Sequence, residues 1–428
     1  MTMRILVLDG NENHAVASVR SLARAGHAVE VGASTSWSKA GWSRDAASCF
    51  IYPAPQQDAL AFVHCIAEEA SREPGTLVLP MTERTTLPLS LHRDVIYATG
   101  ARLVLPPHET VLRAFDKQET TRLAAALGIS VPQTLVISGI NEARRAAASL
   151  PYPVVLKPRS SEEVTASGKV TATGAPLYAR TADEFITAYE AISRRCSAVL
   201  VQEFIAGAGA GYFALMNQGE LRMEFAHRRI RDVRPTGSGS ALRESVRPDG
   251  RVKAAALAIL RALQWHGVAM VEFRQKADGT PVFMEVNGRF WNSLPLAVYA
   301  GADFPARLAE LAERGDVETQ LDYQHGVKCR WLLGDFRHLI EVLRGAPKGY
   351  PVAFPSRLKT LAKICIPVRG TLHDNLTLRD PLPELGDWLD FLLRRLPAGL
   401  KGKSYKSLRS RAWSSAFRRN VSSAKKSA

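Results

Sequence analysis

Apolar runs and amphipathic segments alternate along the first part of the chain. A short apolar strand is predicted at Arg4–Leu8, and a polar loop then leads into an amphipathic helix from about His14 to Ala25. Gly26 is expected to end that helix, and His27–Val31 returns as a second strand. The order strand, helix, strand predicts a βαβ unit and therefore a parallel sheet covered by helices.

Two further strands are predicted at Thr76–Leu79 and Arg102–Leu105. Ligands of open α/β sheets bind at the carboxyl ends of strands. The polar residues that follow the strands are therefore candidates for binding a second substrate, and helix capping explains them equally well; they are Asp9, Asn11, Thr82 and Glu83. The first loop lacks the glycine fingerprint of dinucleotide binding, so no nicotinamide site is expected.

The pattern changes after Ala114. Asp116 and Lys117 open a predicted helix that Gly128 closes, and residues 153–158 form a strand that carries Lys157 near its end. A polar loop through residue 174 and a helix near residues 182–191 follow. The segment 199–205 is a further apolar strand, and glycines 207, 209 and 211 come directly after it. These glycines predict a flexible hinge.

The stretch Val268–Arg289 predicts a β-hairpin. Two apolar segments flank Asp278-Gly279, a strong turn signal. A two-residue turn there, or a four-residue loop around it, pairs Ala277 with Thr280. Counting back along both strands then sets Glu272 directly opposite Glu285.

Opposed carboxylates require a cation between them. Residues paired across strands have Cβ atoms roughly 4.5–5.5 Å apart, and like charges there are destabilising. Asn287 and Arg289 follow Glu285 at alternate positions and so share its face. Mg²⁺ holding a polyphosphate fits, because it takes a few carboxylates and leaves its other positions to phosphate oxygens. A register slip of one residue, which leaves an exposed polar face, is the alternative.

A basic segment precedes the hairpin. If residues 227–234 form a strand, His227, Arg229 and Arg231 share one face. Arginine side chains bind carboxylates and phosphates through two parallel hydrogen bonds. A solvated basic strand face is an equally good explanation of the same residues.

Charge and composition narrow the function classes. The chain has 428 residues, which predicts two or three domains, and a formal net charge of +15. Nine Lys or Arg residues and no acid lie in residues 401–428, so about +6 remains for the body, as in an enzyme that handles anions. The five scattered cysteines and the lack of a long apolar run favour a cytoplasmic protein without a zinc site or disulfides.

The C-terminal part is predicted to be amphipathic and then basic. Gly326–Leu343 is expected to cover a core, and Asp387–Leu396 is a second such helix ahead of the basic tail. An apolar face followed by clustered cations is also typical of peripheral membrane contact. A docked helix with a disordered tail is favoured, since chain termini are often disordered. Nucleic-acid binding is not expected.

The ordered series of motifs resembles the ATP-grasp superfamily, which includes biotin carboxylase, the carbamoyl-phosphate synthase large subunit and D-alanine–D-alanine ligase. The series is a lysine after a helix-opening Asp, a lysine ending a strand, a hinge, and an acidic hairpin that ends in Glu-x-Asn. The resemblance covers roughly residues 1–304. Each motif alone is weak, and their order and spacing make the match specific.

The resemblance implies a role for each matching residue. Lys117 and Lys157 match the lysines that contact ATP phosphates, and Arg289 matches an arginine that steadies the transferred phosphate. The hinge that reads adenine matches Gln202, Glu203, Phe204 and Ile205. The ligands of Mg²⁺ (or Mn²⁺) match Glu272, Glu285 and Asn287, and the strand that approaches the γ-phosphate and the carboxylate substrate carries Arg229 and Arg231.

The chain departs from the family pattern just after the hinge. The family places an acid there to bind the ribose hydroxyls, but residues 206–210 read Ala-Gly-Ala-Gly-Ala. Ribose binding must therefore rest on another residue, or nucleotide affinity is reduced.

The resemblance also implies a fold class of α/β and α+β. The expected domains are a Rossmann-like pre-ATP-grasp domain at 1–113, a two-subdomain ATP-grasp domain at 114–305 with its hinge at about 202–211, a helical C-terminal extension at 306–400, and a basic, disordered tail at 401–428.

The expected function is ATP-dependent ligation. A small carboxylate is activated as an acyl-phosphate, with ADP released, and is then joined to an amine. The alternatives are a bicarbonate-activating carboxylase or an enzyme like carbamoyl-phosphate synthase. An alternative of another class is a non-catalytic ATP-binding module at a membrane surface, suggested by the missing ribose acid.

Overall fold

A parallel sheet with helices on both faces forms the N-terminal domain of the computed structural model, which describes residues 2–159, 162–164, 170–172, 175–196, 198–366, 369–393 and 395. The strand order is β3 (Ser48–Ile51), β2 (Ala28–Ala33), β1 (Arg4–Val7), β4 (Leu77–Leu79), and all neighbours are parallel. The predicted strand at residues 102–105 is reduced to one bridge between Leu77 and Arg102.

The helix predicted from about His14 to Ala25 is confirmed as α1 (Asn13–Arg24). It lies on one face of the sheet, and Gly26 follows it with φ 89°, a conformation that glycine adopts readily. Helices α2 (Ala59–Ser71), α3 (Glu83–Leu91) and α4 (Arg93–Tyr97) complete the domain. The core beneath α1 continues into the large sheet described below, through Phe213, Phe225 and Trp291. The two parts therefore share one core.

Two short helices lead out of this domain. Helix α5 (His108–Phe115) stops at Asp116, whose side chain accepts hydrogen bonds from the backbone N–H groups of Gln118 and Glu119 and so caps α6 (Lys117–Ala126). Lys117 is thus the first residue of α6, as predicted.

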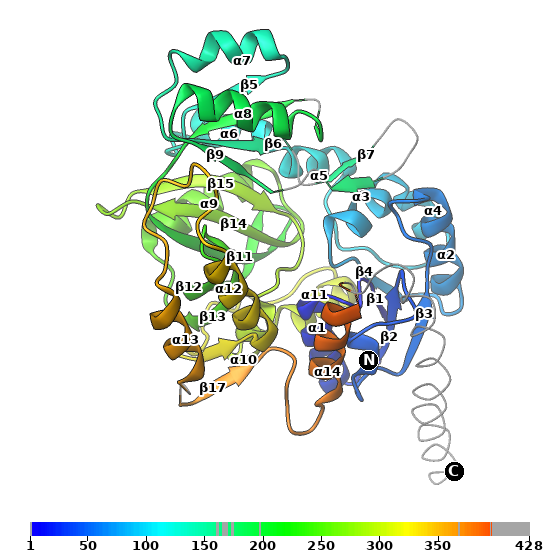
Figure 1. Cartoon of the computed structure of the whole chain (residues 1–428). Helices are drawn as coiled ribbons and strands as arrows, with labels where there is room; N and C mark the ends of the chain where they lie inside the picture. The colour runs from blue at the N-terminus through cyan, green and yellow to red at the C-terminus, as the bar shows by residue number, and fades with distance from the viewer. Residues whose placement is uncertain are drawn as a thin grey trace, which may run out of the picture.

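A small subdomain follows, seen at the top of Figure 1. Its antiparallel sheet has the order β5 (Thr134–Ile137), β10 (Val199–Glu203), β6 (Val154–Pro158), β9 (Leu177–Ala179). Helices α7 (Ile140–Ala147) and α8 (Ala182–Ile192) cover one face, and their core includes Val154 and Leu156 of β6. Because strand side chains alternate, Lys157 lies on the opposite face. Between β6 and β9 the described residues form only the hairpin of β7 (Glu162–Val164) and β8 (Val170–Ala172).

The large sheet has seven strands. Their order is β15 (Pro281–Asn287), β14 (Gly267–Gln275), β11 (Ala208–Asn217), β12 (Glu220–Arg234), β13 (Ser238–Ser245), β16 (Lys328–Arg330), β17 (Thr371–His373). Helix α9 (Gly250–Ala262) packs on it through Ala256 and Leu260, while α10 (Leu294–Tyr299) and α11 (Phe304–Arg314) pack into the core shared with α1.

The C-terminal extension contributes strands as well as helices. Besides α12 (Leu332–Arg344), α13 (Arg357–Cys365) and α14 (Leu382–Leu393), it supplies β16 and β17, so it completes the large sheet. Buried ion pairs also join it to the N-terminal domain, between Lys39 and Asp387 and between Arg20 and Asp380. None of the helices in the described ranges combines the length and apolar content that a bilayer span requires. The basic tail, 401–428, lies outside the described residues.

Candidate active site between the two sheets

The hairpin of β14 and β15 brings Glu272 opposite Glu285, as predicted, but by a different path. Its loop has three residues, 277–279: Gly279 donates its N–H to the Lys276 carbonyl oxygen and adopts φ 79°. The strands therefore leave the turn one residue out of the predicted register. A β-bulge at Met284 adds one residue to β15 and restores the pairing of the two glutamates.

Each opposed carboxylate has a cationic partner. Glu272 accepts a hydrogen bond from Arg229 of β12 at 3.0 Å, and Glu285 lies 3.5 Å from the Lys117 Nζ atom. Asn287 donates its amide to Glu285 at 3.4 Å, and Arg289 donates to the Asn287 amide oxygen at 2.9 Å. The hairpin residues named from the sequence thus lie together.

The two lysines reach this hairpin from the small subdomain side. The Lys117 N–H donates to the Arg159 carbonyl oxygen, and Asp116 pairs with the Arg159 guanidinium, so the start of α6 is tied to the end of β6. Lys157 lies in β6 on the face away from α7 and α8. Burial, which Glu285 opposes and the charge of Lys117 reinforces, lowers the pKa of Lys157 to about 8.

These charges influence one another strongly. Burial alone raises the pKa of Glu285, but Lys117 and Lys157 outweigh burial, so this pKa lies below its usual value. We call Lys117, Lys157, Arg229, Glu272, Glu285, Asn287 and Arg289 the inter-sheet cluster. Its cations outnumber its carboxylates, which suits a polyanionic ligand.

Arg231 does not join this cluster, and the prediction that Arg229 and Arg231 share a face is wrong. The pairing of β12 with β13 shifts twice, at Arg229–Arg231 and at Arg231–Asp232. Arg231 instead pairs with the buried Asp335 of α12 and donates to the Lys363 carbonyl oxygen of α13. The same shifts bring Asp232 to within 3.9 Å of the Arg229 guanidinium.

His227 shares the buried part of this strand. Its Nε2 atom lies 2.8 Å from the Ser293 hydroxyl, and its ring stacks on Phe213. Burial, with the charge of Arg229, holds the pKa of His227 well below its usual value, so this side chain is neutral.

The predicted hinge is held by hydrogen bonds to the neighbouring strands. The Gln202 amide donates to the Thr134 hydroxyl, and the N–H of Glu203 donates to the Gln133 carbonyl oxygen at 2.9 Å. The N–H of Phe204 donates to the Pro153 carbonyl oxygen, and Ile205 is buried. These contacts fix the backbone of the segment, and its binding of adenine stays a prediction.

The candidates from the N-terminal domain separate into two groups. Asp9 accepts hydrogen bonds from the N–H groups of Met81 and Thr82 and from the Thr85 hydroxyl, so its role here is capping. The Asn11 side-chain amide donates a hydrogen bond to the Trp37 carbonyl oxygen.

Glu83 has a different position, because its carboxylate lies 3.7 Å from Arg289. His14, also near Arg289, bridges the Met81 carbonyl oxygen and the Asn292 amide. Burial lowers the pKa of His14 to about 4. The N-terminal domain therefore contacts the Arg289 end of the cluster.

The sequence interpretation missed Arg274 and Asp232. Arg274 follows Glu272 by two positions on β14, so alternation alone could have placed it on the same face. It donates to the carbonyl oxygens of Gly207 and Thr236 at 3.0 and 3.2 Å. Asp232 gave no such signal, because its orientation depends on the shifted pairing of β12.

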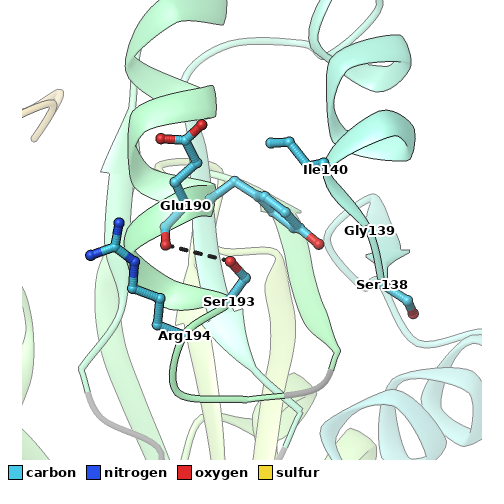
Figure 2. Close-up of a pocket in the computed structure, with 7 residues that line it drawn as sticks. Ser138, Gly139, Ile140, Glu190, Ser193 and Arg194 are labelled. Atoms are coloured by element: carbon cyan, nitrogen blue, oxygen red, sulfur yellow. Dashed lines mark hydrogen bonds between the residues drawn. The ribbon is translucent and has the colours of Figure 1, made fainter.

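One surface pocket lies away from this cluster. A cavity of about 340 Å³ is lined by Ser138, Gly139 and Ile140 at the start of α7 and by Glu190, Ser193 and Arg194 at the end of α8 (Figure 2). It belongs to the helical layer of the small subdomain, whereas Lys157 lies on the other face of the sheet. No residue of the inter-sheet cluster lines it.

A magnesium ion fits the inter-sheet cluster in a limited way. Across the described residues no group of three or more His, Cys, Asp or Glu side chains has the arrangement of a metal site. Glu272, Glu285 and Asn287 offer two carboxylates and an amide on one face. That set suits Mg²⁺ whose remaining ligands are water and phosphate oxygens.

Two protein-family models match the part of the chain that forms this site. The model of the ATP-grasp domain family matches residues 109–217, and that of the family described as ATP-grasp in the biosynthetic pathway with Ter operon matches residues 195–334. Together they span the lysines, the hinge and the hairpin. No curated protein matches the chain.

Solved structures share the fold at low sequence identity. Biotin carboxylase from Campylobacter jejuni, in complex with β,γ-ATP, has a TM-score of 0.58 and 14% identity over 76% of this chain and 74% of that one. The L-amino acid ligase from Bacillus licheniformis has a TM-score of 0.54 and 15% identity over 74% and 76%.

A third structure bears on the cofactors. The biotin carboxylase domain of 2-oxoglutarate carboxylase from Hydrogenobacter thermophilus, in complex with MgADP, ADP and bicarbonate, has a TM-score of 0.57 and 13% identity over 77% of this chain and 74% of that one. The expected cofactors, ATP and Mg²⁺, agree with this neighbour and with the matched domain family. The ordered motifs and both family models lead to one conclusion: residues 109–334 form an ATP-grasp domain.

Proposed function

We propose that the chain is an ATP-dependent ligase that activates a small carboxylate as an acyl-phosphate and joins it to an amine. The observation that carries this proposal is the pairing of Glu272 and Glu285 across the hairpin while Lys117 contacts Glu285 from the other side. Opposed carboxylates and approaching lysines suit a metal-bound polyphosphate between them.

Different residues of the chain bind the phosphates, the base and the metal ion. Lys117 and Lys157 hold the phosphates, and segment 202–205 holds the base. Glu272, Glu285 and Asn287 would hold Mg²⁺, which neutralises charge on the phosphate oxygens when bound. Arg289, anchored on Asn287 at 2.9 Å, steadies the transferred phosphoryl group.

The reaction has two balanced steps. A carboxylate oxygen attacks the γ-phosphorus of ATP, the bond to the β-phosphate oxygen breaks, and ADP leaves. The amine nitrogen then attacks the acyl carbon, phosphate leaves with the bonding electrons, and the nitrogen loses a proton. Glu83 lies 3.7 Å from Arg289, so the N-terminal domain offers a carboxylate where the amine would arrive.

Bicarbonate is the second candidate acid. The structural neighbour that contains bicarbonate is a biotin carboxylase domain with the same fold. Arg229, which contacts Glu272 at 3.0 Å, is an arginine beside the hairpin carboxylates that could bind such an acid.

A pooled screen tests the proposal. Full-length protein with Mg²⁺ and ATP is incubated with pools of amino acids, small carboxylates and bicarbonate, and ADP formation and product mass are measured. We expect ADP in one pool and a product equal to acid plus amine minus water. Glu285→Ala should abolish this turnover, with the exposed Glu318→Ala as the matched control. Undiminished turnover by Glu285→Ala would contradict the metal assignment.

A further inference from the structure

Three aromatic rings meet beside the predicted hinge. Tyr178 of β9, Phe204 after β10 and Tyr350 of the C-terminal extension lie with ring centroids 5.1–6.2 Å apart, each pair edge to face. We call these residues the ring cluster. All three side chains are partly exposed, so the cluster keeps open ring surface.

The loop between α12 and α13 carries Tyr350 to this position. In Figure 1 this orange segment runs from α12 toward β9. Gly349 adopts φ 74° and packs so closely that a Cβ atom there would lie 2.3 Å from the Tyr178 carbonyl oxygen. The Tyr350 N–H donates to the Pro347 carbonyl oxygen, which closes a turn. The contact is therefore built into the loop.

The ring cluster adjoins the residues that carry the phosphate chemistry. Tyr178 pairs with Val155, which is two residues before Lys157 on the same strand face. Arg274 is near both regions. Burial raises the pKa of Tyr178, and the positive charge of Arg274 opposes that rise. Burial lowers the pKa of Lys157, and the same charge adds to that fall. The rings thus mark the hinge end of the same inter-sheet region.

Asp232 lies between the ring cluster and the metal ligands. Its carboxylate is 3.9 Å from Arg229, which is itself bonded to Glu272. Burial raises the pKa of Tyr350, and the charge of Asp232 adds to that rise. Among the described residues, the buried Oδ1 atom of Asp232 has no hydrogen-bond partner. A buried carboxylate oxygen without a donor is costly unless a ligand supplies one.

The C-terminal extension also holds Asp232 in place. The Nδ1–H of His338 in α12 donates to the Asp232 backbone carbonyl oxygen at 2.6 Å. The extension therefore positions both Tyr350 and Asp232.

We propose that these residues form the nucleoside subsite: the ring cluster packs on the purine base, and Asp232 accepts hydrogen bonds from the ribose hydroxyls. This inference rests on the proposed function, because it takes ATP as the ligand of the inter-sheet cluster. Base, ribose and phosphates follow one another in ATP, and the ring cluster, Asp232 and the metal ligands follow one another in the same order here.

The proposal explains how ribose is bound although the segment after the hinge lacks the acid that the family places there. Residues 206–210 offer no acid, and Asp232 supplies one from β12 instead. Carboxylate oxygens accept strong hydrogen bonds from hydroxyl groups, and aromatic side chains stack on the face of any nucleic-acid base.

The affinities of the full chain for three ligands distinguish the contributions of the base, the ribose hydroxyls and the phosphates. Dissociation constants for MgATP, 2′,3′-dideoxy-ATP and magnesium tripolyphosphate are measured for wild type, Tyr350→Ala, Tyr350→Phe and Asp232→Ala. Val352→Ala, an exposed position in the same loop, is the control. Thermal unfolding of each variant confirms that it is folded.

Each arm has an expected result. Tyr350→Ala should weaken MgATP and dideoxy-ATP about tenfold, which is the lower range for loss of one stacking ring, and leave tripolyphosphate unchanged. Tyr350→Phe and Val352→Ala should bind like wild type. Asp232→Ala should weaken MgATP several-fold and leave dideoxy-ATP unchanged.

The contrary results are distinct. Equal affinity of wild type and both alanine variants for MgATP would overturn the subsite and leave the ligase proposal standing. An equal loss for all three ligands would overturn it too. Wild type that binds MgATP with these variant effects, yet joins no acid to an amine, would overturn the ligase and keep the subsite. Wild type without affinity for MgATP would overturn both.

Discussion

Lys157 is half-buried among other charges at the centre of the proposed site, and its protonation state decides how well it can hold phosphate. Its alternation with Val154 and Leu156 along β6 was readable from the sequence, and so was its place at the end of an apolar strand. Its pKa of about 8 was not, because that value depends on burial and on Lys117, Glu285 and Arg274 from distant segments. Sequence patterns place a side chain on a face, whereas its electrostatics follow from tertiary packing.

Nucleotide affinity should therefore fall as the pH rises through about 8. The pKa of Lys157 is lowered in the folded protein, so the side chain is protonated below that value and loses its charge above it. Bound phosphate favours the protonated form, so binding near pH 8 should also take up a proton. The measurement is the dissociation constant of MgADP between pH 6.5 and 9.5.

Lys157→Arg is the matched control, since arginine stays charged throughout this range. Its affinity should be flat where that of the wild type declines. Parallel pH profiles for the two proteins would assign the decline to another group.

At the scale of elements, irregular strands decide which side chains meet. The predicted opposition of Glu272 and Glu285 is confirmed, although the predicted loop length is wrong, because the three-residue loop and the bulge at Met284 cancel in register. In β12 the two shifts cancel only at Asp232, so Arg231, which lies between them, is separated from Arg229. Turn residues are visible in a sequence. Bulges were not predicted, because they depend on the packing of neighbouring strands.

The two arginines of β12 should therefore behave differently. Arg229→Ala should reduce turnover by at least tenfold, because it removes the cation that contacts Glu272 at 3.0 Å, and should change stability little. Arg231→Ala should leave nucleotide affinity unchanged and lower the free energy of unfolding by about 2 kcal/mol. Removing one partner of a buried pair is costly, and Arg330 still contacts Asp335.

Denaturant unfolding, MgADP binding and ADP formation, measured on both variants, check this pair of predictions. A loss of turnover in Arg231→Ala equal to that in Arg229→Ala would show that the two side chains act together after all.

At the scale of the whole molecule, the parts are joined by contacts that no local pattern relates. The α/β fold class and the order of the ATP-grasp motifs were predictable, and both family models agree with them. The core shared by α1, α10 and α11, and the contact of Tyr350 with Tyr178, join residues far apart in sequence. The division at residues 113 and 305 stays a proposal about chain segments, and membrane contact stays a prediction for residues 401–428.

The shared core predicts cooperative unfolding of the N-terminal domain with the large sheet. Phe213, Phe225 and Trp291 pack in the same core as α1, so a fragment of residues 1–113 would expose that apolar face to water. We expect the isolated fragment to be insoluble or unfolded, and the full chain to give one calorimetric transition for these two parts. A soluble fragment with a sharp thermal transition of its own would contradict this account.

The central claim is that a carboxylate is activated by phosphoryl transfer, and oxygen tracing tests it most directly. The enzyme is given Mg²⁺, ATP, amines and a pool of small acids whose carboxylate oxygens are ¹⁸O-labelled, and the nucleotide and phosphate products are examined by mass spectrometry. An acyl-phosphate intermediate predicts ADP and inorganic phosphate that carries one ¹⁸O atom from the acid. Unlabelled phosphate, or label transferred to AMP, would contradict it.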